Sequence, residues 1–201
     1  MAKILILNGS PRAPKSNSKR YAEIFLKYCG CPAEYCGITK SNHEELCRRF
    51  RDFTDILLVF PLYADGIPVT LLNFLKTLEQ NPPENRPTIS VLINCGFLEA
   101  RQNDVAVKMA ELFCRRNGYP FGSVLKIGSG EAILDTPFQI FAARKIRRLA
   151  ASVVSGKHCT LQTSMPLSPS MFVKASVSYW VNYGAKNGSA KEQMETMEIE
   201  K

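Results

Sequence analysis

The chain has 201 residues, of which 45% are hydrophobic and 22% are charged, a composition typical of a globular protein with one sizeable core. No apolar run approaches the roughly 20 residues of a membrane-spanning helix, and the first residues lack the pattern of a signal peptide. We therefore expect a cytoplasmic protein with no membrane contact. The net charge of +8 suits an anionic partner, but no aromatic residues are interleaved with the one basic cluster, Arg144, Lys145, Arg147 and Arg148, so we do not expect nucleic-acid binding.

Five short apolar segments alternate along the chain with stretches of helical length. We expect strands at residues 3–7, 34–38, 55–60, 88–93 and 123–127, and helices at 18–28, 42–51, 69–78, 102–117 and 137–154. The third strand is apolar throughout after Asp55, which indicates burial on both faces, as in a parallel sheet. Strands that alternate with helices in this way predict a three-layer α/β fold, in which a five-stranded, doubly wound, flavodoxin-like parallel sheet carries helices on both faces.

Residues 156–201 differ in composition and are rich in Ser, Pro and Met. We expect residues 1–155 to form the main domain, and residues 156–201 to form a helical extension that packs on it, with a helix at 173–186 and a flexible tail from residue 192. An apolar stripe at helical spacing consists of Phe172, Val173, Ser176, Val177 and Trp180. Such a stripe packs against the sheet or against a second subunit, and we favour the sheet.

The seven cysteines are an odd number, and in a cytoplasmic chain we expect them to be reduced thiols. Cys29, Cys31 and Cys36 lie close together in the sequence, but their spacing matches neither zinc-site pairs nor the common iron–sulfur runs. We therefore expect no metal site. The two histidines, His43 and His158, do not follow an expected strand at the ligand-binding edge, so we do not expect a hydrolase triad.

In doubly wound sheets, ligands bind at the carboxyl ends of the strands, where the strand order reverses. We therefore expect function in the loops after the first, third and fourth strands. The loop after the first strand begins at Asn8 and leads to Ser16, Asn17 and Ser18 at the start of a helix, where free backbone N–H groups and the helix dipole favour anions. No Asp or Glu lies between Asn8 and Arg20. These features predict a phosphate site; the alternative interpretation is a helix cap followed by a solvated basic loop.

This loop matches neither the Walker A nor the G-x-G-x-x-G pattern. It is similar to the phosphate loop of the NAD(P)H-dependent FMN reductases, a branch of the flavodoxin-like superfamily, and the similarity covers residues 3–155. The matching residues are Gly9, Ser10, Arg12, Ser16, Asn17 and Ser18. The resemblance implies that FMN is the cofactor, with its phosphate held by Ser10, Arg12, Ser16, Asn17 and Ser18.

The loop after the third strand consists of Pro61, Leu62, Tyr63, Ala64 and Asp65. A flat heterocycle needs backbone amides at its polar edge and an apolar surface on its face. We expect Tyr63 to stack on a flavin ring and Asp65 to accept a hydrogen bond from it; alternatively, Tyr63 closes the edge of the core and Asp65 forms a turn. The chain departs from the resemblance in residues 72–76, because many relatives carry a Lys and an Asp in this helix.

The loop after the fourth strand contains Asn94, Cys95, Gly96 and Phe97. The resemblance implies that it lies along the flavin ring, where Gly96 permits close approach of the backbone and Phe97 covers the ring or the nicotinamide. For Cys95 we favour a small buried thiol over a redox group. Residues 128–131, after the fifth strand, either border the same pocket or form a plain turn.

Together, these features predict an enzyme that takes a hydride from NAD(P)H through FMN and passes electrons to a quinone, a free flavin or another small acceptor. Because the flavin supplies the hydride chemistry, we expect binding residues and no catalytic acid–base pair. The resemblance also implies a homodimer. Two alternatives remain: a flavodoxin-type electron carrier, against which the net charge of +8 argues, and a flavodoxin-like binding module that has lost its cofactor.

Overall fold

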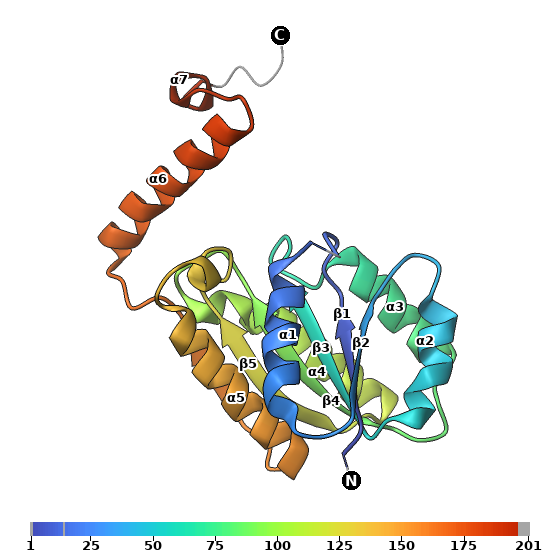
Figure 1. Ribbon diagram of the computed structural model, residues 1–201. Coiled ribbons are helices and arrows are strands. Elements are labelled where there is room, and N and C mark those ends of the chain that lie inside the picture. Colours follow the sequence, from blue (N-terminus) through green and yellow to red (C-terminus); the bar gives the residue numbers. More distant parts are fainter. Residues whose placement is uncertain (1, 14, 197–201) are drawn as a thin grey trace. The chain divides into compact units, whose positions relative to one another are not determined.

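The computed structural model describes residues 2–13 and 15–196, which form two compact units, one ending at Met165 and one beginning at Pro166. The first unit contains a parallel sheet with the strand order β2-β1-β3-β4-β5-β6 (Figure 1). Its strands are β1 (Ile4–Asn8), β2 (Ala33–Gly37), β3 (Asp55–Pro61), β4 (Thr88–Asn94), β5 (Phe121–Ile127) and β6 (Thr160–Thr163). Its α-helices are α1 (Asn17–Cys29), α2 (His43–Arg49), α3 (Val69–Gln80), α4 (Asp104–Asn117) and α5 (Gln139–Ser155).

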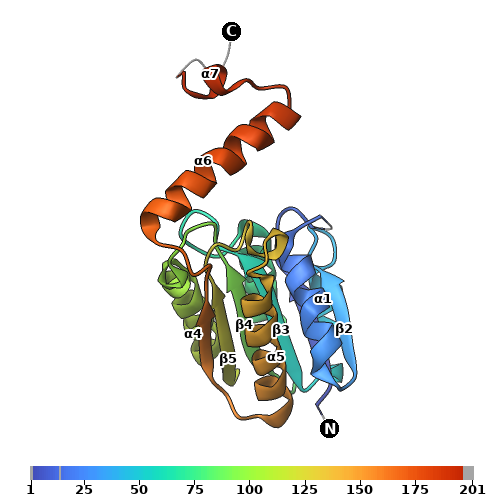
Figure 2. The ribbon, with the colours of Figure 1, turned by 60° about the vertical axis from the view of Figure 1, so that its left-hand side comes forward.

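The helices cover both faces of the sheet, so the first unit has three layers (Figure 2). Helices α1 and α5 contact each other on one face. On the other face, α2, α3 and α4 bury side chains such as Leu46, Phe74 and Ala110 against β1, β3 and β4. The central strands are buried on both sides because their sequences are almost wholly apolar. The predicted three-layer α/β fold is therefore confirmed.

The register of the strands brings three polar loops to one edge of the sheet. Asn8, the last residue of β1, pairs with Val59 of β3, and Pro61, the last residue of β3, pairs with Asn94 at the end of β4. Because all the strands are parallel, their carboxyl ends share this edge. The chain order also reverses here, since β2 and β3 lie on opposite sides of β1. This is the position at which doubly wound sheets bind ligands.

The sheet has six strands, so the prediction of five was one too few. The sixth strand, β6, pairs with β5 in parallel, from Val124 with Thr160 to Ile127 with Thr163. It has only four residues, of which Leu161 alone is buried, so it leaves no apolar run in the sequence. Buried hydroxyls help to hold it: the Oγ atoms of Ser123 and Ser152 lie 2.6 Å apart, and Ser123 Oγ accepts a 3.4 Å hydrogen bond from the N–H of Cys159.

The second unit contains α6 (Pro169–Lys186) and a short helix α7 (Lys191–Met194). Helix α6 begins four residues before the predicted start at residue 173, because Ser168 caps it by accepting a 3.3 Å hydrogen bond from the N–H of Met171. Part of the segment expected to fray is helical in α7, while residues 197–201 lie outside the described residues. Packing of this extension on the main domain stays a prediction. In the described ranges, 2–13 and 15–196, no helix has the length and apolar character needed to span a bilayer.

Candidate functional site

The loop between β1 and α1 is folded around the side chain of Asn8. Its Oδ1 atom accepts a 2.9 Å hydrogen bond from the N–H of Ser10, while its Nδ2 atom donates to Ser16 Oγ at 3.2 Å and to the hydroxyl of Tyr35 at 2.9 Å. Both ends of the loop are thus attached to one fully buried amide. At Gly9 a Cβ atom would lie 2.9 Å from the Cβ of Leu71 in α3, so the close packing of this turn requires glycine.

The start of α1 offers free hydrogen-bond donors to an anion. Ser16 is extended and caps the helix, its Oγ accepting a 3.2 Å hydrogen bond from the N–H of Lys19. Within the part of the chain that the structure describes, the backbone N–H groups of Asn17 and Ser18 have no acceptor. These groups carry the partial positive charge of the helix N-terminus. The sequence predicted hydrogen-bond donors at the start of a helix that follows a buried strand, and the structure contains this arrangement.

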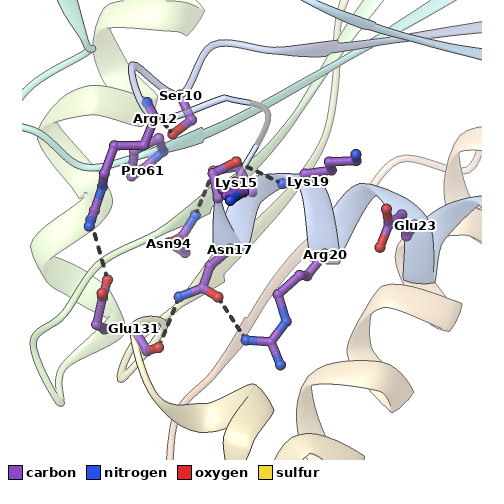
Figure 3. Close-up of a pocket in the computed structure, with 12 residues that line it drawn as sticks. Ser10, Arg12, Lys15, Asn17, Lys19, Arg20, Glu23, Pro61, Asn94 and Glu131 are labelled. Carbon is purple, nitrogen blue, oxygen red and sulfur yellow. Dashed lines mark hydrogen bonds and ion pairs between the residues drawn. The ribbon is translucent and has the colours of Figure 1, made fainter. Parts of the chain in front are cut away.

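A cavity of about 380 Å³ lies beside these donors (Figure 3). Four basic and two acidic side chains line it, together with serines, asparagines and one proline. The lining residues are Ser10, Arg12, Lys15, Ser16, Asn17, Ser18, Lys19, Arg20, Glu23, Pro61, Asn94 and Glu131. All five residues predicted to hold a phosphate are among them. The excess of basic groups makes the cavity suitable for an anionic ligand.

Asn94 connects three of the loops beneath this cavity. Its Nδ2 atom donates to Ser18 Oγ at 3.3 Å and to the carbonyl oxygen of Phe60 at 3.2 Å, and its own carbonyl oxygen accepts a 2.7 Å hydrogen bond from the N–H of Leu62. Both Asn94 and Ser18 are buried. Both hydrogens of the Asn94 side-chain nitrogen are therefore bound by the protein, and this side chain acts as a brace between α1, β3 and β4.

The segment after β5 brings an acidic side chain to the cavity, although the loop after β1 has none. Glu131 Oε2 lies 3.6 Å from a guanidinium nitrogen of Arg12, and Figure 3 shows the Arg12 side chain reaching toward it. The backbone of Glu131 is fixed to α1, since its carbonyl oxygen accepts a 2.9 Å hydrogen bond from Asn17 Nδ2. The expectation that residues 128–131 border the pocket is confirmed at Glu131.

Two further contacts fasten this segment to α1. The hydroxyl of Tyr21, which is fully buried, donates a 2.9 Å hydrogen bond to the carbonyl oxygen of Gly130. Arg20 forms a two-pronged ion pair with Asp135, at 2.6 and 3.1 Å, and this hydrogen bonding raises the pKa of the guanidinium. Burial likewise raises the pKa of Tyr21 above its ordinary value, so its hydroxyl stays protonated and remains a donor. We call the segment from Gly128 to Asp135 the clamp loop.

The loop after β3 forms a tight two-residue turn. Tyr63 and Gly66 exchange backbone hydrogen bonds of 3.1 and 3.0 Å, and the two residues between them, Ala64 and Asp65, have φ angles of 45° and 57°. Positive φ at both central positions defines a type I′ turn, which usually contains Asn and Gly. The Tyr63 side chain is 60% exposed. It does not close the edge of the core, which was the alternative considered from the sequence.

The loop after β4 contains one buried thiol and one exposed ring. The Sγ of Cys95 accepts a 3.3 Å hydrogen bond from Asn103 Nδ2, and burial raises the pKa of this thiol. This environment supports the prediction of a packed thiol, because reactive cysteines have lowered pKa values and are partly exposed. Phe97 is 52% exposed. A Cβ at Gly96 would meet no atom within 4 Å, so nothing in the chain itself requires glycine there.

The structure thus brings half of the predicted site residues into the cavity. Those that line it are Ser10, Arg12, Ser16, Asn17, Ser18, Pro61 and Asn94; those at the same sheet edge that do not line it are Leu62, Tyr63, Ala64, Asp65, Cys95, Gly96 and Phe97. Sequence reasoning missed the lining residues Lys15, Lys19, Arg20 and Glu23. The spacing of four residues between Lys19 and Glu23 on α1 was the available signal for a shared helix face.

Across the described residues, no group of three or more His, Cys, Asp and Glu side chains is close enough to hold a metal ion.

Comparison with known proteins gives matches in structure alone. No family model matches the sequence, and no curated protein matches it. One similar structure is an NAD(P)H:quinone oxidoreductase from Methanothermobacter marburgensis, with a TM-score of 0.60 and 14% identity over 79% of this chain and 97% of that one. Another is an FMN-dependent NADH-azoreductase from Bacillus anthracis in complex with FMN, with a TM-score of 0.57 and 14% identity over 77% of this chain and 100% of that one.

A rubredoxin oxygen:oxidoreductase from Desulfovibrio gigas is also similar, with a TM-score of 0.60 and 12% identity over 77% of this chain. The match spans only 35% of that protein's own length. The first five strands of the sheet have the order β2-β1-β3-β4-β5 found in flavodoxins. The chain has a flavodoxin-like fold. At these identities the comparisons establish the fold, in agreement with the resemblance seen in the sequence.

Proposed function

We propose that this protein is an FMN-dependent oxidoreductase that takes a hydride from NAD(P)H and passes electrons to a quinone, a free flavin or another small acceptor. The observation that carries the proposal is the donor-rich cavity at the start of α1, placed at the point where the strand order of a flavodoxin-like sheet reverses. The names of the similar structures, a quinone oxidoreductase and an FMN-dependent azoreductase, support the same chemistry.

The cavity has the donor set that a phosphate group requires. The N–H groups of Asn17 and Ser18, which have no acceptor among the described residues, and the hydroxyl of Ser10 provide hydrogen bonds, and Arg12 provides a charge. The side chain of Arg12 is 71% exposed and paired only loosely, at 3.6 Å, with Glu131. Because exposed ion pairs contribute little stability, Arg12 is available to exchange this carboxylate for a phosphate.

The neighbouring loops have the surface that a flavin ring requires. Tyr63 and Phe97 present exposed aromatic side chains on the loops after β3 and β4, and the open position at Gly96 leaves room for a ring beside the backbone. The 380 Å³ cavity lies within the range of about 300–1,000 Å³ typical of sites for small molecules. In our proposal the phosphate is held in this cavity, while the ring lies outside it against the two aromatic loops.

When bound, a flavin supplies the hydride acceptance and electron transfer. The protein contributes binding and orientation. Ser16 and Asn94 form hydrogen bonds that fix the loops, so in this proposal they hold the geometry while Arg12 and the N–H groups of Asn17 and Ser18 bind the phosphate. The tight turn at Ala64 and Asp65 fixes the backbone on which Tyr63 stands. No acid–base residue is assigned, because hydride transfer through a flavin needs none from the protein.

We further propose that the protein is cytoplasmic, since all seven of its cysteines are free thiols, and that it is a homodimer. Its formal net charge of +8 suits an enzyme that receives the anionic NAD(P)H better than an electron carrier of the flavodoxin type.

The first experiment is a titration of the purified chain with FMN, followed by extraction and identification of the bound flavin by mass. Arg12→Ala is expected to weaken FMN binding by about tenfold, the lower end of the range for a charge-assisted hydrogen bond, because this side chain is exposed. Arg115→Ala, an exposed arginine in the last turn of α4, changes the net charge equally and is expected to leave the affinity unchanged. Equal affinities for all three proteins would contradict the phosphate assignment.

The second experiment separates an enzyme from a carrier. With FMN bound and oxygen excluded, NADH or NADPH is expected to bleach the flavin absorbance on mixing. An intact flavin spectrum with both reductants would exclude the reductase and leave the carrier, and failure to bind any flavin would exclude both.

A further inference from the structure

The cavity at the start of α1 extends along this helix beyond the residues that we propose for the phosphate of FMN. Its lining continues from Asn17 and Ser18 through Lys19 to Glu23, and Figure 3 shows this order along α1. With a rise of about 1.5 Å per residue, roughly 9 Å of helix separate Asn17 from Glu23. A phosphate group bound at the helix start does not reach this far end of the cavity.

The far end lies away from the proposed position of the flavin ring. In our proposal the ring lies against the loops after β3 and β4, and the lining residues nearest to those loops are Pro61 and Asn94, the last residues of these two strands. In Figure 3, Asn94 and Glu23 lie on opposite sides of Asn17. A ligand that runs from the ring to the phosphate can therefore continue along α1 toward Glu23.

The positive charge of the cavity also exceeds what one phosphate uses. Arg20 is committed to Asp135, at 2.6 Å, and Arg12 is the side chain that we propose for the phosphate of FMN. Within the described ranges, Lys15 and Lys19 form no ion pair. Two lysines that line the cavity are therefore available for a second anionic group.

The order of these groups along α1 matches the order of groups in a nucleotide. Lys19 lies two residues, or about 3 Å of helix, beyond Asn17, so its flexible side chain reaches a phosphate adjacent to the one at the helix start. Glu23 lies one turn further along the same face of the helix. Its carboxylate can accept hydrogen bonds from the hydroxyls of a ribose, the role of an acidic residue in other dinucleotide sites.

We propose that Lys15, Lys19 and Glu23 form a second subsite, which binds the nucleoside phosphate of a dinucleotide. Two ligands have this chemistry: FAD, in which the nucleoside phosphate is bonded to the phosphate of FMN, and NAD(P)H, the reductant of the proposed function. The inference rests on the proposed function, because it takes the first phosphate to lie at the start of α1.

The first experiment compares the binding of FMN and FAD to the purified full chain by titration calorimetry. Lys19→Gln is expected to weaken FAD binding by about tenfold, the lower end of the range for a charge-assisted hydrogen bond. It is expected to change FMN binding by less than about twofold, because with FMN the ammonium group faces only solvent. The control Lys27→Gln removes the same charge from an exposed position on α1 outside the cavity, and it is expected to leave both affinities unchanged.

The second experiment distinguishes the two ligands. It measures the binding of NAD⁺ and NADP⁺, which cannot donate a hydride, to the chain loaded with FMN. If the subsite holds the second half of FAD, then FAD binds at least about tenfold more tightly than FMN, and Lys19→Gln leaves the affinity for NAD⁺ and NADP⁺ unchanged. If the subsite holds NAD(P)H, then FAD binds no more tightly than FMN, and Lys19→Gln weakens the binding of NAD⁺ and NADP⁺ instead.

Three results would overturn the inference. If FMN binds and Arg12→Ala weakens it, but Lys19→Gln acts on FAD, NAD⁺ and NADP⁺ no more than Lys27→Gln does, the second subsite is absent and the proposed function stands. If Lys19→Gln weakens FMN as much as FAD, Lys19 belongs to the first phosphate. If neither flavin binds, the proposed function and this inference fail together.

Discussion

Glu131 is expected to oppose the binding of a phosphate in the cavity of the first unit. Its carboxylate lies 3.6 Å from Arg12, the side chain that we propose for the phosphate, so a bound dianion must displace it and remain close to it. Glu131→Gln removes the negative charge and keeps the size of the side chain. We therefore expect this substitution to tighten FMN binding, although it removes an ion pair seen in the structure.

The size of the effect follows from distance and exposure. Unit charges about 4 Å apart interact by about 1 kcal/mol in water and about 4 kcal/mol near a protein surface. The side chains of Arg12 and Glu131 are 71% and 36% exposed, so the lower value applies. About 1 kcal/mol corresponds to a dissociation constant for FMN roughly fivefold lower. The difference should shrink in 1 M salt, where the Debye length is about 3 Å.

The assay is a flavin fluorescence titration with FMN and with riboflavin, which lacks the phosphate. Glu131→Gln is expected to strengthen FMN binding alone, and Glu23→Gln, which lines the same cavity away from Arg12, is expected to have a smaller effect. An equal gain for riboflavin would show that charge repulsion of the phosphate is not the cause. Weaker FMN binding would show instead that Glu131 positions Arg12 productively, which would refute our reasoning.

Two further predictions concern stability. Ala64→Gly is expected to stabilise the fold by about 1 kcal/mol, because Ala64 has a φ of 45° and a left-handed conformation costs a non-glycine residue roughly 1–2 kcal/mol; thermal unfolding tests this, and a lowered Tm would count against it. Burial raises the pKa of Cys114 to about 12, so its contribution to stability is complete below the pKa of about 8.5 of the unfolded thiol and is lost as the pH rises toward 12. In urea titrations above pH 9, the unfolding free energy of the wild-type chain is therefore expected to fall more steeply with pH than that of Cys114→Ala, by about 1.4 kcal/mol per pH unit. Equal slopes for the two proteins would show that the thiol of Cys114 is not the cause.

Most of the fold could be predicted from the sequence because the central strands are buried on both faces. Burial of this kind requires a continuous apolar run, as in Asp55–Pro61, and such runs are visible without a structure. The strand β6 could not be found in this way, because an edge strand of four residues with one buried side chain has no such run. Its position depends in part on the hydroxyl of Ser123, which accepts a hydrogen bond from the N–H of Cys159 and lies 36 residues earlier in the chain.

The candidate site, like the fold, has features that could be predicted from the sequence and features that could not. The donors of the loop after β1 were predictable, because a glycine turn and a helix cap are local features. Residues 128–131 were considered as a border of the pocket, but the pairing of Glu131 with Arg12 was not predictable, because it depends on the packing of the clamp loop on α1, as in the hydrogen bond of Asn17 to the backbone of Glu131. A turn at Asp65 was one alternative considered from the sequence, but its type I′ geometry was not predictable, since alanine at position 64 gives no signal for positive φ.

The clamp loop also sets the order in which this cavity is completed during synthesis. The donors of α1 leave the ribosome early, but their partners Gly130, Glu131 and Asp135 are made more than a hundred residues later. A nascent chain that ends after β4 already contains every serine and asparagine of the cavity, yet lacks the wall that fixes Asn17 and Arg20. The cavity of the growing polypeptide is therefore complete only after the segment following β5 has emerged and closed against the first helix.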